Sequence, residues 1–462
     1  MKPYLLVDFG STYTKLTAVD LENEYIIGTS KAPTTVETNV LDGYDVAFKR
    51  LMHDHPEIKE ISGISACSSA AGGLKMAAIG LVEELTVEAA KRACLGAGAI
   101  VKIVFSHHMT KREAIKLKEA NIDIVLLAGG TDGGNKECII HNAKKLVDIE
   151  IDVPVIIAGN KDANDEIEEI FEESNIEYYI VENVMPKLKK LNVKEAKHII
   201  RKIFIEKIIE AKGIKKAEVK IGEIIMPTPE AVLLASELLS KGYEDQEGYG
   251  ELMIVDIGGA TTDVHTIGEG FPKRTEVILK GLQEPFAKRT VEGDLGMRYS
   301  ANALLSLVSN YEFKKYFEAD DNCDHDIRKS LDRRATNVDF IPLTKDEEEF
   351  DKAIAKICCD VSISRHVGHV EVVSTPLGNM YYQTGKDLSD IKYVIGTGGV
   401  LINHQDAKKI LKQVNKKSDK LLELRPNNPS ILIDRSYILA SMGLLSQKYP
   451  RIALKLMKQY LL

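Results

Sequence analysis

The segment Leu5–Lys15, which reads LLVDFGSTYTK, is matched half a chain later by Met253–Asp263, which reads MIVDIGGATTD. Each segment ends an apolar run in an aspartate, places a glycine two residues later and continues through small or hydroxylated residues into a second strand-like stretch. The pattern predicts two β-hairpins with tight turns, one in each half of the chain. One D-x-G-[SG] turn is a weak signal, but its recurrence in the same strand context favours a duplicated architecture.

Apolar strand-like runs alternate with amphipathic helical patterns along most of the 462 residues. The runs that we predict as strands are 4–9, 26–30, 61–66, 101–105, 122–128, 153–158, 177–181, 252–257, 263–267 and 392–396. This alternation predicts an α/β fold whose sheets are covered by helices. The helical pattern of residues 81–96 ends at Gly96, which we predict to be its C-cap.

A chain of this length exceeds one ordinary hydrophobic core, so two or three lobes are expected. The polar, glycine-rich stretch KGYEDQEGYG at 241–250 marks the predicted boundary. We therefore predict a first lobe over 1–245 and a second over 251–447, with a C-terminal helix at about 448–462 that packs back on the first lobe.

The overall composition argues against several classes of function. The net charge of -8 argues against a general nucleic-acid-binding protein, which needs an excess of lysine and arginine. No apolar run is long enough to span a membrane, so we expect no membrane partner. The six cysteines are scattered, which indicates reduced thiols and a cytoplasmic location.

A tight turn of glycine, serine and threonine leaves backbone N–H groups free to bind phosphate oxygens. An aspartate at the end of the preceding strand can hold Mg²⁺ through water molecules. We therefore predict that Asp8 and Asp256 hold Mg²⁺ and that the two turns grip a polyphosphate from both sides. The candidate phosphate-binding residues are Gly10, Ser11, Thr12, Lys15, Gly258, Gly259 and Thr261.

A third glycine cluster, at Gly396, Gly398 and Gly399, follows the last predicted strand in YVIGTGGVLIN. It is either a plain strand-to-helix turn or a bare backbone surface for an adenosine. The sequence contains neither a G-x-G-x-x-G fingerprint nor a P-loop, so the Rossmann and P-loop classes of nucleotide site are excluded.

The order of two phosphate hairpins followed by an adenosine turn resembles the actin, heat-shock chaperone and sugar kinase superfamily of ATPases. The whole chain is similar to one branch, the MutL/GlmL proteins associated with coenzyme-B12-dependent glutamate mutase, which are unrelated to the mismatch-repair protein of the same name. The segments that carry the resemblance are DFGSTYTK, LLAGGTDGGN, IMPTPEAVLLASELL, DIGGATTDVH, RTVEGDLGMR, VIGTGGVL and LIDRSYILASMGLL. The resemblance implies two actin-like (ribonuclease H-like) lobes with a nucleotide cleft between them, ATP and Mg²⁺ as cofactors, and a chaperone-like role toward a mutase.

One position departs from the family pattern. In the heat-shock chaperones the segment before the crossing helix carries a glutamate that orients the attacking water, and here Met226 occupies that place. Glu230 lies one turn too late, and Thr228 with Pro229 has the character of a helix start. Slow ATP hydrolysis is therefore expected.

Asp132 is the best substitute for the missing glutamate, which makes Asp8, Asp132 and Asp256 the candidate catalytic residues. Asp132 follows a predicted strand in the glycine turn AGGTDGGN, where an α/β sheet presents its binding crevice. A turn stabilised by an Asx hydrogen bond would give the same pattern.

Two functional classes remain. The first is a weak ATPase that acts as a chaperone or reactivating factor on subunits of a coenzyme-B12-dependent mutase, with glutamate (methylaspartate) mutase as the favoured client. The second is a small-molecule kinase with the same nucleotide site and Asp132 as the base. The sequence leaves the oligomeric state open.

Overall fold

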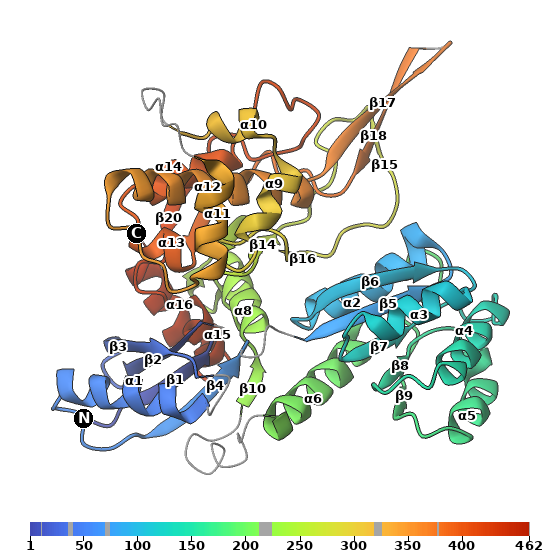
Figure 1. Ribbon diagram of the computed structural model, residues 1–462, viewed down its shortest axis with the longest axis horizontal. Coiled ribbons are helices and arrows are strands. Elements are labelled where there is room, and N and C mark those ends of the chain that lie inside the picture. The colour runs from blue at the N-terminus through green and yellow to red at the C-terminus, as the bar shows by residue number, and fades with distance from the viewer. Residues whose placement is uncertain are drawn as a thin grey trace. The chain divides into compact units, whose positions relative to one another are not determined.

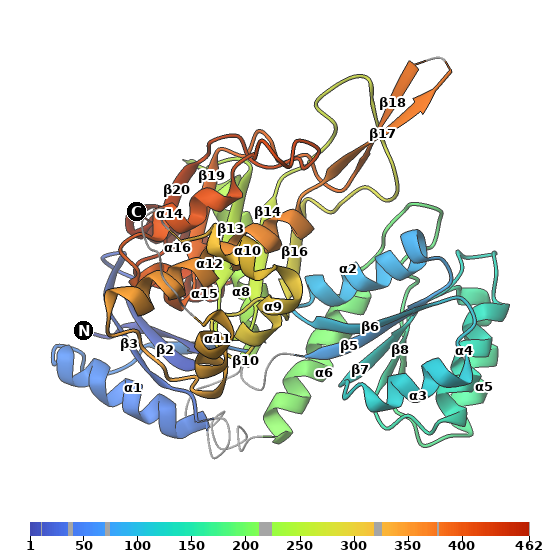
Figure 2. The same cartoon turned by 45° about the horizontal axis from the view of Figure 1, so that its top comes forward.

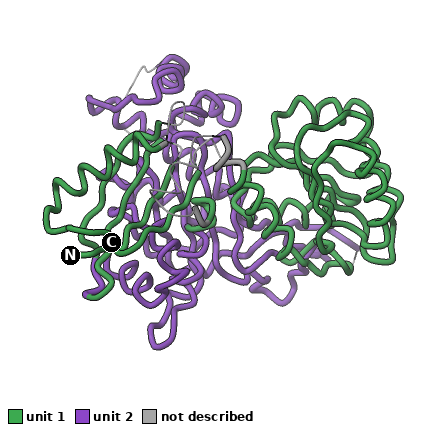
Figure 3. The backbone as a smooth tube through the Cα atoms, turned by 90° about the horizontal axis from the view of Figure 1, so that it is seen from below, with its two compact units in different colours: residues 1–22, 26–231, 281–283 green, residues 23–25, 232–280, 284–462 purple. Residues whose placement is uncertain are grey.

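The computed structural model describes residues 1–10, 12–35, 40–69, 74–211, 224–317, 326–376 and 378–461. The chain forms two compact units (Figure 3). Unit 1 contains residues 1–22, 26–231 and 281–283, and unit 2 contains the remainder. The chain passes from one to the other between Ala231 and Val232, inside helix α8 (Thr228–Lys241). The predicted boundary at 241–250 forms a short hairpin in unit 2, made of β11 (Gly242–Tyr243) and β12 (Gln246–Glu247).

Unit 1 begins with a five-stranded sheet in the order β10-β4-β1-β2-β3 (Figure 1). Its strands are β1 (Tyr4–Phe9), β2 (Tyr13–Asp20), β3 (Tyr25–Pro33), β4 (Gly63–Ser68) and β10 (Ile224–Pro227). β1 is antiparallel to β2 and parallel to β4, which is itself parallel to β10. All six residues of β1 are buried because the strand lies in the middle of the sheet, which explains its continuous apolar pattern.

The main sheet of unit 2 repeats this topology in the order β16-β14-β13-β19-β20. Its strands are β13 (Leu252–Ile257), β14 (Thr262–Ile267), β16 (Ala287–Glu292), β19 (Tyr393–Thr397) and β20 (Ser430–Ile433). β13 is antiparallel to β14 and parallel to β19, as β1 is to β2 and β4. The predicted duplication is thus confirmed, and both sheets have the mixed strand order of the ribonuclease H-like lobes that the resemblance implies.

A complete second α/β layer structure is inserted between β4 and β10. Its sheet is fully parallel in the order β6-β5-β7-β8-β9. The strands are β5 (Lys75–Gly80), β6 (Ile100–Ser106), β7 (Ile124–Leu127), β8 (Val155–Ile157) and β9 (Tyr178–Ile180). This is the 2-1-3-4-5 order of doubly wound, flavodoxin-like sheets.

The helices of this insert divide between the two faces of its sheet, as a doubly wound fold requires (Figures 1 and 2). They are α2 (Glu88–Gly96), α3 (Lys111–Glu119), α4 (Glu137–Asp148), α5 (Asn164–Glu172) and α6 (Lys194–Ala211). Met76 and Ala78 of β5 share one core with α2 and α6. Ala77 and Ile79, which point to the opposite face, share another with α3, α4 and α5. The alternation of side chains along β5 therefore serves two cores at once.

The other helices lie around the two mixed sheets. They are α1 (Val40–Asp54) in unit 1 and, in unit 2, α9 (Leu304–Leu307), α10 (Asn310–Lys314), α11 (Ile327–Thr336), α12 (Lys345–His366), α13 (Gly399–Asn403), α14 (Ala407–Leu411), α15 (Leu439–Ser446) and α16 (Pro450–Tyr460). A small sheet of unit 2 contains β15 (Val277–Leu279), β18 (Gly378–Thr384) and β17 (His369–Thr375) in that order. The C-terminal helix α16 packs on α15, and its Lys455 forms an ion pair of 2.5 Å with Glu24 in the β2–β3 turn.

Every strand that the sequence predicts is present, whereas one helix end differs. Helix α2 includes Gly96 as its last residue, and the residue with a left-handed backbone is Gly98, at φ +84°. The cause is local: Ala97 and Gly98 still donate to carbonyls of the last turn, so the C-cap is Ala97, one residue later than predicted.

Arg425 forms a buried ionic cluster that ties helix α12 to the segment before β20. Its side chain is fully buried, and it pairs with Asp360 Oδ1 at 2.8 Å and with Glu423. It also donates to the backbone carbonyls of Gln413 and Asp360. Burial by itself would raise the pKa of Asp360, but Arg425 and Lys417 outweigh burial and hold this pKa below its ordinary value.

We predict that Arg425→Met lowers the free energy of unfolding by about 3 kcal/mol at pH 7, because the buried Asp360 and the partly buried Glu423 lose the arginine between them, while Asp360 keeps Lys417 as a partner. Because the pKa of Asp360 is lowered in the folded state, its contribution is present above the unfolded pKa and is lost as the pH falls through the folded one. Urea unfolding followed by circular dichroism should therefore show a smaller difference near pH 4 (about the unfolded carboxyl pKa) than at neutral pH. Arg451→Met, at a half-exposed ion pair of 3.9 Å, is the control; an equal loss in both variants would contradict the assignment.

Candidate functional site

Asp8 lies at the end of the central strand of the first sheet and is almost completely buried. Both of its carboxylate oxygens are engaged. Lys15 Nζ donates to Oδ2 at 2.8 Å, and Thr228 Oγ1 donates to Oδ1 at 2.6 Å. The Cys67 thiol donates to Oδ1 at 3.6 Å. Burial, with the Asp8 charge in second place, raises the pKa of Cys67 well above its ordinary value, so this thiol is a donor and not a thiolate.

The first turn is closed by a hydrogen bond from Gly10 N to Tyr13 O at 3.1 Å. A side chain at Gly10 is excluded, since its Cβ would stand 2.6 Å from Tyr13 O. Lys15 Nζ lies 3.8 Å from the same Cβ position, so its ammonium group is next to the turn. Thr12 is partly exposed and its carbonyl accepts from Thr34 N. Ser11, the other predicted phosphate-binding residue, lies outside the described residues.

The second turn has the same closure, from Gly258 N to Thr261 O at 2.9 Å. The strand registers also agree, because Asp8 faces Lys15 across its hairpin and Asp256 faces Asp263 across the other. The electrostatics differ at this facing position. Asp263 forms an ion pair of 2.6 Å with Arg289 and accepts from the Thr261 hydroxyl at 3.2 Å. The first aspartate thus has a lysine beside it, and the second has an acid that an arginine already neutralises.

The structure brings Asp256 and the third glycine cluster together. β13 and β19 are parallel, and Asp256 pairs in register with Thr397, so both strands deliver their last residues to one edge. A Cβ at Gly398 would stand 2.4 Å from Ile257 O and 2.6 Å from Asp256 Oδ1, and Gly398 has φ +93°. Only glycine fits there.

The other two members of the cluster have different surroundings. Gly399 is exposed and nothing lies within 4 Å of its Cβ position, which leaves the bare backbone surface that a flat ligand needs. Gly396 is buried inside β19, where a Cβ would meet Leu411 at 2.4 Å. Close packing is thus a sufficient physical reason for the glycine at 396.

The segment 293–300 supports the second turn, which the sequence alone did not indicate. Met297 N and Arg298 N donate to the carbonyls of Gly258 and Gly259, and Ser300 Oγ donates to Ala260 O at 2.6 Å. Gly296 permits this contact, since its Cβ would stand 2.6 Å from Ala260 C. With these carbonyls bonded behind it, the turn has a fixed shape.

Thr228 is the most important site residue that sequence reasoning missed. We expected it to act at the start of the following helix, but its hydroxyl donates to Asp8, 220 positions earlier. The contact exists because β10 lies parallel beside β4, which lies parallel beside β1, so the ends of three strands converge. Met226 is fully buried in β10, and Glu230 forms an ion pair with Arg201.

Asp132 lies in a different sheet from Asp8, in the loop after β7 of the insert. Its Oδ1 accepts from Asn183 Nδ2 at 2.9 Å and from Lys161 N at 3.2 Å. The buried amides of Asn160 and Asn183 bond to the same glycine loop through Gly134 O and Gly130 O. Asp132 therefore joins the loops that follow β7, β8 and β9, at the carboxyl edge where doubly wound sheets bind ligands.

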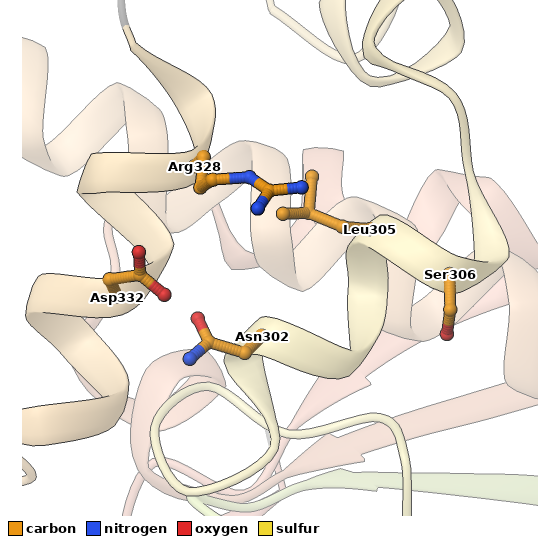
Figure 4. A pocket seen from close by; sticks show the side chains of 5 residues that line it. All are labelled: Asn302, Leu305, Ser306, Arg328 and Asp332. Carbon is orange, nitrogen blue, oxygen red and sulfur yellow. The ribbon is translucent and has the colours of Figure 1, made fainter.

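A shallow pocket of about 360 Å³ in unit 2 is lined by none of the predicted site residues. Arg328 and Asp332, one turn apart on α11, face Leu305 and Asn302 (Figure 4), and Ser306 completes the lining. The Asp332 and Asn302 side chains point toward one another.

The residues around Asp8 fit a hydrated divalent cation. The ammonium group of Lys15 already stands against Asp8 Oδ2, so this oxygen accommodates positive charge. Among the residues that the structure describes, no group of three or more His, Cys, Asp or Glu side chains converges on one point. A cation at Asp8 or Asp256 would thus rely on water and phosphate for its other ligands, as Mg²⁺ does.

The neighbouring glycines of the third cluster give a matched test of this geometry. We predict that Gly398→Ala lowers the free energy of unfolding by about 2 kcal/mol or more, because a left-handed backbone and a clash with Ile257 O combine. Gly399→Ala, in open space at the first position of α13, should be neutral or gain about 0.5 kcal/mol. Thermal unfolding measures the stability of both variants. Equal stabilities would contradict the packing described for Gly398 and Gly399.

Comparison with known proteins places the chain in a family. Residues 4–461 match the MutL protein family. The chain is 51% identical over 465 residues to Protein MutL of Clostridium tetanomorphum, which covers all of this chain and 99% of the relative.

The chain also matches distantly related solved structures. A glycerol dehydratase reactivase is 10% identical, with a TM-score of 0.34 and coverage of 96% of this chain and 99% of that one. A xylulose kinase of Lactobacillus acidophilus is 12% identical, with a TM-score of 0.35 and coverage of 100% and 92%. At these values the likeness adds nothing to what the sheet topologies establish. Among the described residues, no helix has the length and apolar character to cross a membrane. The family match and the full-length identity together show that the chain belongs to the MutL protein family.

Proposed function

We propose that this protein binds Mg–ATP, hydrolyses it slowly and uses the cycle to maintain or reactivate a coenzyme-B12-dependent mutase, with glutamate mutase as the client. The observation that carries the proposal is the matched pair of turns after Asp8 and Asp256, each closed by the same glycine hydrogen bond. Membership of the MutL family supports it, because the proteins that the sequence resembles are associated with glutamate mutase.

In this proposal each turn holds phosphate oxygens through backbone N–H groups. Asp8 and Asp256 would accept hydrogen bonds from the water ligands of Mg²⁺, and Lys15, which lies beside Asp8, would pair with the phosphates. Mg²⁺ supplies neutralising charge to the phosphates. Gly399 offers its bare backbone to the adenosine, and Gly398 keeps this surface close to Asp256.

Slow hydrolysis follows from the segment that precedes α8. Met226 is apolar and buried, so it orients no water molecule, and Glu230 is held by Arg201. A slow ATPase suits a factor that holds one state long enough to act on a client.

The chaperone role requires that nucleotide binding alters the protein as a whole. Thr228 touches Asp8 and begins α8, and the chain enters unit 2 four residues later inside that helix. A change at Asp8 therefore reaches the element that joins the units. Opening a mutase to release damaged cobalamin calls for a large population shift, and a shift of ~10⁴-fold needs about 5.5 kcal/mol of differential binding.

We predict that Asp8→Asn and Asp256→Asn each weaken Mg–ATP binding at least about tenfold, a loss of ~1.4 kcal/mol, and weaken Mg-free ATP binding less. Asparagine keeps an acceptor for Thr228 but removes the charge that attracts the cation. Isothermal titration calorimetry with and without Mg²⁺ measures both effects. Asp245→Asn, an exposed carboxylate, is the control, and thermal unfolding of each apo variant checks that Lys15 tolerates the change. Unchanged affinities in both site variants would remove the basis for the nucleotide site.

We further predict that inactivated glutamate mutase regains activity when this protein, Mg–ATP and free adenosylcobalamin are added together. The Asp256→Asn variant should fail and Asp245→Asn should succeed. Recovery that needs no ATP, or no recovery of any coenzyme-B12-dependent mutase from the same host, would defeat the proposal. Transfer of phosphate from ATP to a small metabolite would point to a kinase instead.

A further inference from the structure

The small sheet β15-β18-β17 extends from unit 2 as an arm (Figures 1 and 2), and its distal part exposes side chains on both faces. Most residues of β17 are exposed, and so are those at the start of β18. The exposed apolar side chains include Val372 on one face and Val373, Met380 and Ile278 on the other. A sheet of this size normally needs one face packed on a core. An arm with apolar side chains exposed to solvent on both faces is therefore unusual.

The outer edge of β17 has unpaired backbone groups at its distal end. Val370 N donates to Leu422 O at 2.9 Å, so even-numbered residues of β17 direct their N–H groups away from β18. By the same alternation the N–H and C=O groups of Val372 and Ser374 point outward, and no backbone group of the described residues pairs with them on that side. Neither proline nor lysine occurs within β17 to block a further strand.

We propose that this edge pairs with the same edge of a second copy of the chain, antiparallel and with a two-fold axis at Val373. Val372 and Ser374 of each copy then exchange backbone hydrogen bonds with Ser374 and Val372 of the other. The two arms become one continuous sheet. A two-fold axis makes the contact isologous, which is the commonest way in which identical chains close a dimer.

The charges of β17 and the residues next to it favour pairing with a second copy of the chain and favour the register with the axis at Val373. With the axis at Val373, the valine faces its own copy, and Glu371 faces Thr375, so no like charges are opposed. An axis at Val372 would require Val370 to pair with Ser374 of the other copy, but the N–H of Val370 already bonds to Leu422 O. An axis at Ser374 would place Val372 opposite Pro376, which has no N–H. The edge is therefore complementary to itself in one register.

The paired segment is short, so its contact area lies below the ~1,200 Å² of stable interfaces and the dimer should be reversible. Sedimentation velocity over a concentration series should show a monomer–dimer equilibrium. Val372→Pro should shift this equilibrium toward monomer, because it removes an outward N–H without removing a hydrogen bond to β18. Leu343→Lys, which adds a charge at an apolar side chain that is 88% exposed elsewhere in unit 2, should leave the equilibrium unchanged.

The decisive test uses the residue on the axis. Val373→Lys and Val373→Glu should each weaken self-association at least about tenfold, because like charges then face each other across the two-fold axis. An equimolar mixture of the two variants should form a heterodimer with at least wild-type affinity, since unlike charges now meet. Circular dichroism confirms that each variant is folded.

Three outcomes would overturn the proposal: a monomeric wild type at every concentration, single variants that dimerise as well as the wild type, or a mixture no better than its components. A monomer whose Val373 variants lose only mutase reactivation would assign the edge to the client protein. Because the sedimentation result is independent of nucleotide and mutase, failure of the proposed function would leave this inference standing.

Discussion

The hydrogen bond between Thr228 and Asp8 is the contact on which the first site depends. A buried carboxylate is tolerated only when its charge and lone pairs are satisfied, and Asp8 meets this condition through Lys15 and Thr228 together. Thr228 also begins α8, so one residue both contacts the site and starts the helix through which the chain enters unit 2.

The two mixed sheets agree in backbone geometry but differ in the side chains near their aspartates. Turn closure, strand order and register agree in both, since each depends on backbone hydrogen bonds that many side chains allow. The side chains at the facing position have diverged, from Lys15 to an Asp263 that pairs with Arg289. The second turn is also supported from behind by Met297, Arg298 and Ser300. The first aspartate thus has a lysine as its ionic partner, whereas the second turn is held in a fixed shape by the segment behind it.

The parallel insert changes how Asp132 is interpreted. From its sequence context the residue could belong to the nucleotide site or to a hydrogen-bonded turn. Its observed partners, Asn183 and the Lys161 amide, make it a link among three loops of a separate sheet. That sheet has its own carboxyl edge and buries side chains on both of its faces. The core on the side of α3, α4 and α5 belongs to the insert alone, whereas the core on the side of α2 and α6 is continuous with that of the first mixed sheet.

What the sequence determined by itself is local. The ten predicted strands, the two hairpin turns and the α/β class follow from residue alternation and from the steric needs of Gly10 and Gly258, which act over a few positions. Contacts such as Thr228 with Asp8, Gly398 with Asp256 and Ser300 with the second turn depend on which strands lie side by side. Parallel pairing joins segments that are distant in the chain, and the order of the strands in the sheet cannot be predicted from a local sequence pattern. The tertiary structure therefore decided the partners of each aspartate, the separate sheet of Asp132 and the distal edge of β17 that no described strand pairs with. Each of these is set by strand neighbours and not by the residues next to it in sequence.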